Sequence, residues 1–275
     1  MADKIQLSAA IRSNLLTLNR TNDLADRTQS RLSSGLKVAS ALDDAAAFFA
    51  ARALTFRADD LNRLKDNIDQ SISTIQSAIN GIEAITQLIE QAQGIAITAK
   101  ATGDTTERSS LAAQFNALLV QIDDLSNDAS YNGQNLLQGT PDNLVVDFNE
   151  DSTSQLTVSG IDSTTAATGL NVAASGNDFA SDTDIDVALT ATRAALTTLR
   201  TSAAVLGSNN TVLQTRLDFT EDLVNTLEEG AGKLTLADLN EESANLLSLQ
   251  TRQQLGLNSL SLAAQSERAI LNLFG

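Results

Sequence analysis

Apolar residues recur at alternating spacings of four and three along most of this chain, the pattern of helices that pack through a narrow seam. The pattern predicts helices over about 5–32, 43–101, 105–129, 185–229 and 235–273. Short turns separate some of these segments, so the neighbouring helices should run antiparallel. The sequence thus predicts a mainly α fold, an elongated helical rod or coiled-coil bundle formed by the N- and C-terminal halves.

The helical pattern stops in the middle of the chain. Residues 144–148 and 155–158 are rich in β-branched and other apolar residues and flank a polar turn, which predicts two short strands. The rest of 141–184 is rich in Ser, Thr, Asp, Gly and Ala. We expect a small β-containing or irregular outer segment there that projects from the rod.

Three parts follow from these patterns. Residues 1–42 and 231–275 should form the terminal helices, 43–140 and 185–230 the rod, and 141–184 the outer segment. A run of Gly-Ala-Gly at 230–232 should end the fourth helix, because glycine readily adopts the backbone that stops a helix.

A joint between two helices is predicted between Arg31 and Asp44. Ser34 and Gly35 look like a helix end, since glycine tolerates the left-handed conformation found there. Asp43 and Asp44 look like a new helix start, because carboxylates are favoured where free N–H groups point outward.

The terminal helices each carry one apolar stripe, and two such helices form only a thin pair. Isolated helix pairs are marginal in water, and burying a leucine is worth about 1.5–3 kcal/mol, so these stripes should contact other copies of the chain. The alternative is an ordinary monomeric bundle. The predicted contact residues are Ile11, Leu15, Leu18, Leu32, Leu246, Leu249, Leu257, Leu260 and Leu271.

Composition removes several classes of function. The chain has no His and no Cys, which excludes most metal sites and most nucleophile–base pairs. Its net charge is −16, and residues 66–230 hold 5 Lys or Arg against 23 Asp or Glu, which argues against nucleic acid as a partner. We expect no membrane insertion, because there is no apolar run of about 18 residues. The N-terminus lacks the apolar core of a cleaved signal peptide.

Three short motifs resemble catalytic or ligand-binding signatures but lack their companions. Ser34 to Lys37 matches SxxK without the partner motifs, Asp182 to Asp186 begins like a calcium loop without its glycine and glutamate, and Gly230 to Lys233 resembles half a phosphate loop. We expect no enzyme activity, no metal and no cofactor.

The segment RLSSGLKVASALDDAA at 31–46 closely resembles the N-terminal signature of bacterial flagellins. Residues 108–115 resemble the family's RxxLQxEF, and Tyr131 to Leu137 its FNGxxLL. Near the other end, 238–244 resembles the acidic, alanine-containing segment before the terminal helix, and 270–274 the hydrophobic close.

This resemblance implies a structural subunit that self-assembles into the helical flagellar filament for swimming. It implies terminal helices that line the filament core, and an exposed middle segment. It also implies export through the flagellar type III channel with a chaperone, an extracellular location, and sister flagellins, cap and junction proteins as neighbours. The alternative is the hook–filament junction protein, which resembles flagellin at both ends.

The resemblance also assigns a stretch that vertebrate innate receptors read in many flagellins. It includes Ile89 here, but Gln91 and Gln93 stand where arginine is common, and Gly94 where glutamate is common. The charged, bidentate contacts of arginine are therefore missing, and weak receptor activation is expected.

Overall fold

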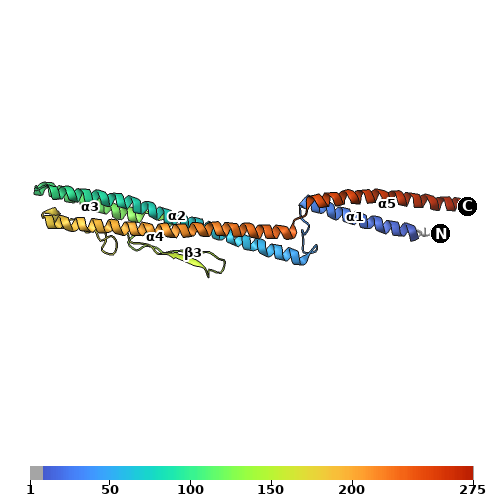
Figure 1. Cartoon of the computed structure of the whole chain (residues 1–275), viewed down its shortest axis with the longest axis horizontal. Coiled ribbons are helices and arrows are strands. Elements are labelled where there is room, and N and C mark those ends of the chain that lie inside the picture. Colours follow the sequence, from blue (N-terminus) through green and yellow to red (C-terminus); the bar gives the residue numbers. More distant parts are fainter. Residues whose placement is uncertain (1–8, 275) are drawn as a thin grey trace. The chain divides into compact units, whose positions relative to one another are not determined.

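Five long helices make up most of the structure (Figure 1). This computed structural model describes the backbone of residues 9–274 and the side chains of 11–266, 268 and 269. The mainly α prediction is confirmed, and the predicted residues 5–8 lie outside the described part. The helices are α1 (Ala9–Ser34), α2 (Ala45–Ala101), α3 (Thr105–Asp128), α4 (Asp182–Thr235) and α5 (Leu239–Phe274).

The prediction that Gly230 to Gly232 ends the fourth helix is wrong, since α4 continues to Thr235. A helical glycine costs only about 1 kcal/mol relative to alanine, which a helix packed against neighbours tolerates. Both glycines also meet close neighbours: a Cβ on Gly232 would lie 3.1 Å from Leu236 Cδ1, and one on Gly230 would lie 3.4 Å from Leu54 Cδ1.

The chain divides by its contacts into two compact units. One contains residues up to 57 and from 226 onward, and the other contains 58–225. The division falls inside α2 and α4, whereas the sequence predicts boundaries at the joint and near residue 230; the three-part organisation stays a prediction.

In the first unit, α1 and α5 lie side by side and run antiparallel (Figure 1). Arg31 near the end of α1 pairs with Glu242 near the start of α5. Farther from this pair, Leu18 of α1 lies against Gly256 of α5. The predicted pairing of the two ends of the chain is therefore present.

In the second unit, α2, α3 and α4 share one hydrophobic core. Its largest fully buried side chains include Ile68, Ile75 and Ile82 of α2, Phe115 of α3 and Leu199 of α4. The seven-residue spacing of the three isoleucines is the predicted seam, and it explains why these segments form packed helices.

Residues 130–181 contain two small antiparallel sheets. β1 (Ser130–Tyr131) pairs with β2 (Gln134–Asn135) across a turn whose two residues have positive φ, and β3 (Leu144–Asp147) pairs with β4 (Gln155–Val158). The second pair confirms the two predicted strands. The first pair was not predicted, although Asn-Gly is a strong hairpin signal. A short 3-10 turn, η1 (Gly176–Phe179), precedes α4.

This middle segment lies along the helices, contrary to the expected projection. Leu137, Val146, Val158 and Phe179 are buried in the same core as the isoleucines of α2. Polar contacts fix it to α3 at several levels, among them Asn135 Nδ2 donating to the carbonyls of Ser126 (2.9 Å) and Asn127 (2.8 Å). Thr165 donates from its backbone and hydroxyl to Asp123, at 2.7 and 2.9 Å, and Asn116 exchanges two hydrogen bonds with Ser175.

Candidate assembly surface

The inner face of the α1–α5 pair contains most of the predicted contact residues. Ile11 and Leu249 are buried, and Leu18, Leu32, Leu246 and Leu260 are half-buried. The four half-buried leucines of this thin seam are therefore still partly open to solvent. The described residues of the two helices therefore pack against each other and still leave apolar side-chain area exposed to solvent.

The outer faces of the same two helices carry further leucines. Leu15 and Leu257, both predicted contact residues, are exposed, and Leu255 is 61% exposed. The predicted Leu271 lies among the residues whose side chains are not described. The sequence interpretation followed one apolar stripe per helix and therefore missed six exposed leucines. The spacings of eight and seven residues between the last three were the available signal. The six are Leu16, Leu24, Leu239, Leu247, Leu255 and Leu262.

Arg31 and Glu242 hold the two helices together near the joint. Arg31 Nη1 donates to Glu242 Oε1 at 2.9 Å, and the glutamate side chain is only 10% exposed. Glu242 lies in the first turn of α5, where the helix dipole also favours a carboxylate. The predicted joint residue Arg31 therefore reaches across to the other end of the chain.

The joint itself is paired to the segment before α5. Gly35 has φ of 72° and its N–H donates to the carbonyl of Arg31 at 2.8 Å, so it ends α1 as predicted. Its carbonyl accepts from Ala237 at 2.9 Å, and the N–H of Lys37 donates to Thr235 at 2.8 Å. Ser34 Oγ accepts from the N–H of Leu36 at 3.2 Å. These hydrogen bonds hold the connection between α1 and α2 against the connection between α4 and α5.

Asp43 and Asp44 shape the start of α2. Asp43 Oδ2 accepts hydrogen bonds from the backbone (3.0 Å) and hydroxyl (3.1 Å) of Ser40 and from the backbone of Ala39 (3.2 Å). These donors, Ser40 first, hold the pKa of Asp43 below its ordinary value. Asp44 Oδ1 accepts from the N–H of Ala47 at 3.0 Å, as a helix-capping residue does. The predicted helix start is therefore confirmed to within two residues.

A second apolar surface lies beside the joint. Phe49, Phe56, Leu42 and Leu236 are each more than half exposed. A groove of about 580 Å³ opens between the start of α2 and the end of α4, lined by residues such as Phe56. Two of the 8 phenylalanines of the chain are thus exposed in this small region, and aromatic residues are enriched where proteins contact one another.

The stretch expected to correspond to the segment that innate receptors bind, residues 89–94, lies in the middle of α2. Ile89 is fully buried in the core, so it cannot be touched from outside. Gln91 and Gly94 are exposed and Gln93 is half-buried. The structure therefore brings only part of this predicted stretch to the surface.

The rejected motifs have structural explanations. Gly230 to Lys233 lies within the continuous helix α4. Asp182 pairs with Arg108 (2.6 Å), Asp184 with the Ser181 hydroxyl (2.6 Å), and Asp186 with Lys100. Across the described part of the chain, no cluster of three or more His, Cys, Asp or Glu side chains is arranged to hold a metal ion. The described helices include none that is long and apolar enough to cross a membrane.

Comparison with known proteins gives the family. Residues 5–142 match the bacterial flagellin N-terminal helical region, and 189–274 match the bacterial flagellin C-terminal helical region. Flagellin FljM of Caulobacter vibrioides is 34% identical over 261 residues, 94% of each chain. Flagellin FljK of the same organism is 33% identical over 99% of this chain and 98% of its own, and a flagellin of Brucella melitensis is 29% identical over 100% and 99%. The chain belongs to the bacterial flagellin family.

Proposed function

We propose that the exposed leucines of α1 and α5 form the surface through which this chain joins a flagellar filament. The chain is a structural subunit of that filament, and the hook–filament junction alternative is not favoured. The observation that carries the proposal is the set of leucines on the outer faces of the terminal helix pair.

The energetics favour association over a lone pair. Burying the exposed half of a leucine side chain is worth on the order of 1 kcal/mol, and the outer faces carry several such leucines. A heterologous contact that does not close on itself repeats into a helical filament. Sister flagellins with the same terminal helices would fit the same contact.

The test is seeded polymerisation of two full-length variants, observed by electron microscopy. Leu255→Glu places a charge in the leucine surface and should stop filament growth while the helical circular dichroism signal stays unchanged. Gln214→Glu makes the same kind of change at an exposed position of α4 and should polymerise like the wild-type chain. Normal filaments from Leu255→Glu would contradict the proposal.

We infer that the chain leaves the cell unfolded through the flagellar type III channel, with an export chaperone and without a cleaved signal peptide. Family membership supports this route. Mass spectrometry of filaments should find the N-terminal residues intact apart from the initiator methionine. A shortened N-terminus in the exported protein would overturn the inference.

We also propose that the chain activates vertebrate flagellin receptors weakly. The exposed Gln91 and half-buried Gln93 lack the charge of the arginines common in the family. In a reporter-cell assay, Gln91→Arg with Gln93→Arg should raise the response above that of the wild-type chain. A wild-type response equal to that of an enterobacterial flagellin would contradict this proposal.

A further inference from the structure

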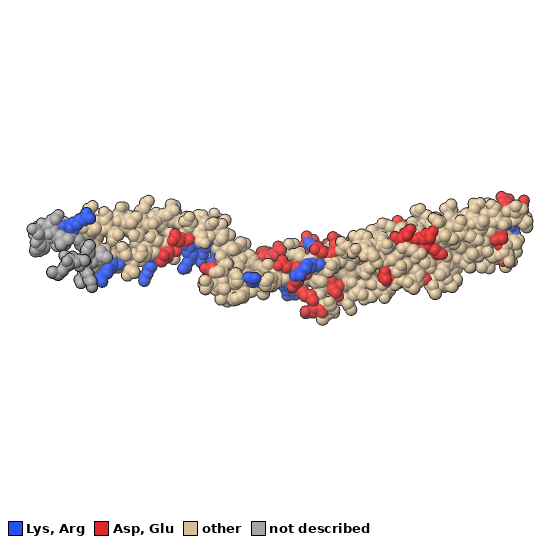
Figure 2. All heavy atoms as spheres, turned by 180° about the vertical axis from the view of Figure 1, so that it is seen from behind, with Lys and Arg blue, Asp and Glu red and all other residues tan. Residues whose placement is uncertain are grey.

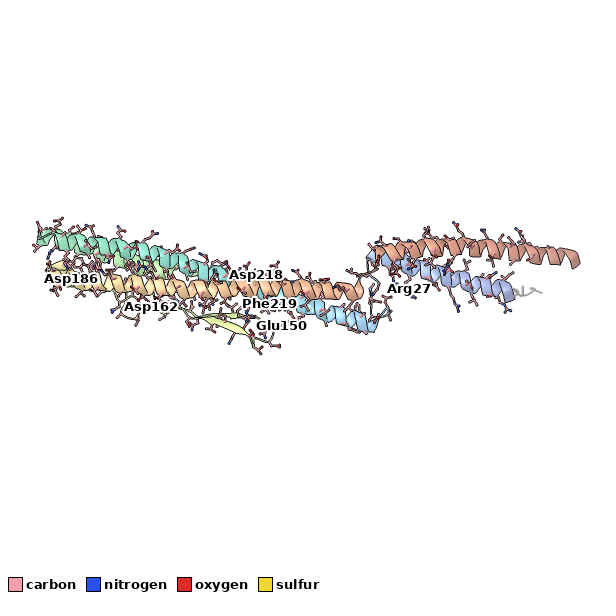
Figure 3. The ribbon with its side chains drawn as sticks, in the orientation of Figure 1. Arg27, Glu150, Asp162, Asp186, Asp218 and Phe219 are labelled. Carbon is pink, nitrogen blue, oxygen red and sulfur yellow. The ribbon has the colours of Figure 1, made fainter. Side chains whose placement is uncertain are left out.

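The outward face of α4 in the second unit carries a stripe with no charged residue. Its ten members recur at spacings of three and four over about nine turns, and all are exposed. Val205 is 50% and Phe219 is 58% exposed, and Figure 3 labels Phe219 at one end of the stripe and Asp186 just before the other. The stripe consists of Val187, Thr190, Ala194, Thr198, Thr201, Val205, Ser208, Val212, Thr215 and Phe219.

The threonines make this stripe more apolar than its sequence suggests. Each of the four donates its hydroxyl to the carbonyl four residues earlier, at 2.8 Å for Thr190, 3.2 Å for Thr198, and 3.0 Å for both Thr201 and Thr215. Because these hydroxyls already donate to backbone carbonyls, they have no donor left to offer water or a partner. The surface is also hollowed along the stripe, with grooves of about 770, 430 and 180 Å³ that each include stripe residues.

The charges around the stripe point to what covers it. Between Asp186 and Asp218 the chain has three arginines, Arg193, Arg200 and Arg216, and no Asp or Glu. This is the reverse of the surroundings, because 66–230 as a whole is strongly acidic. On the face seen in Figure 2, acidic side chains predominate over the part of the molecule away from the termini. Arg216 already stacks on the Phe148 ring of the same chain at 4.9 Å, so Arg193 and Arg200 are the arginines beside the stripe that fit an acidic helix.

The chain itself contains such a helix. Between Lys65 and Lys100, α2 has four carboxylates and no Lys or Arg. Glu83 and Glu90 are both exposed and lie seven residues apart, hence on one face of the helix. Arg193 and Arg200 of α4 are exposed with the same spacing. Each arginine directly precedes a stripe residue, Ala194 or Thr201, so the two arginines lie to one side of the stripe, and their spacing and charge match those of the two glutamates.

We propose that the α4 stripe of one copy docks on the acidic face of α2 of a second copy. The contact is heterologous, so it can repeat without closing. It rests on the proposed filament function and adds to it a second, lateral interface that does not involve the terminal helices. Opposite charges would set the register of the contact and exclude pairings of two acidic faces.

Charge reversal and rescue test this contact in the full-length chain. Arg193→Glu with Arg200→Glu should raise the critical concentration for polymerisation more than about tenfold, and so should Glu83→Arg with Glu90→Arg. The variant with all four changes restores opposite charges at every contact, and its critical concentration should return to within about threefold of wild type. All variants should keep the circular dichroism spectrum of the wild-type monomer, because the four residues are exposed.

The outcomes separate this inference from the proposed function. Wild-type critical concentrations for both double variants, or failure of the fourfold variant to recover, would overturn the α4–α2 contact alone. A wild-type chain that forms no filaments would overturn both. The chain has no cysteine, so Val205→Cys, co-assembled with an excess of wild-type chain, gives a second readout. Its thiol should react with maleimide in the monomer and be protected in the filament; equal reaction in both states would overturn the contact.

Discussion

Arg31 Nη1 and Glu242 Oε1 lie 2.9 Å apart although 211 residues separate them in the sequence. The pair joins the end of α1 to the start of α5. It lies next to the backbone hydrogen bonds between the α1–α2 connection and the α4–α5 connection. The glutamate side chain is only 10% exposed, so the arginine replaces most of its contact with water, whereas the arginine side chain is itself 33% exposed.

Arg31→Ala should destabilise this junction by about 1–2 kcal/mol, because it leaves a mostly buried carboxylate without its partner. Lys233→Ala is the matched control, since Lys233 forms an ion pair with Glu229 in which both side chains are well exposed. That change should cost less than about 0.5 kcal/mol. Thermal melts of both variants give the comparison, and equal losses would contradict the role of Arg31.

The joint should weaken in acid through Asp43. Its pKa is held below the ordinary value, so its carboxylate stabilises the folded joint fully above the ordinary aspartate pKa. That stability is lost as the pH falls through the lowered pKa. The melting temperature of the filament, measured from pH 6 down to about pH 2, should therefore fall less steeply for Asp43→Asn than for the wild-type chain. Identical pH profiles would rule out this contribution.

Two glycines of α2 should respond in opposite directions to alanine. A Cβ on Gly81 would lie 2.8 Å from Leu137 Cδ1 and 2.9 Å from Ala129 Cβ, so Gly81→Ala should destabilise the second unit by about 1–3 kcal/mol. Gly94 has no atom within 4 Å of that position, so Gly94→Ala should stabilise it by up to about 1 kcal/mol. Denaturant unfolding of the two variants measures both effects, and the same sign for both would contradict the packing described.

Asn210 should be replaceable at a gain in stability. Its Oδ1 atom is buried and has no hydrogen-bond partner, and Asn210 lies in α4 one turn after the fully buried Leu206. Leaving such an atom unsatisfied costs about 1–3 kcal/mol, so Asn210→Leu should raise the melting temperature by several degrees. Calorimetry of the monomer measures this, and a lower melting temperature would mean that the amide has an essential partner.

The helices could be predicted because the heptad spacing of apolar residues involves positions close together in the sequence, as the isoleucines of α2 show. Asp44 and Gly35 likewise carry local signals for a helix start and a helix end. The extension of α4 through Gly230 could not be predicted, because the side chain that Gly230 lies against, Leu54, is far away in the sequence. The docking of the middle segment on α3 depends on pairs such as Asp123 with Thr165, which are far apart in the sequence.

The assembly surface was only half visible in the sequence. The predicted stripe on α5 turned out to include the residues that face α1, such as Leu249, while Leu255 and Leu262 face away. A single apolar stripe in the sequence predicts which face of a helix is buried. Only the structure shows which leucines stay exposed to solvent after α5 has packed against α1.

Removal of α5 tests the central claim most directly. A chain lacking 240–275 retains the whole second unit, 58–225. It should keep a strong helical signal yet form no filaments under the electron microscope, with seeds or without, while the full chain forms long ones. Long filaments grown from the shortened chain would contradict the assignment of the terminal helix pair as the assembly surface.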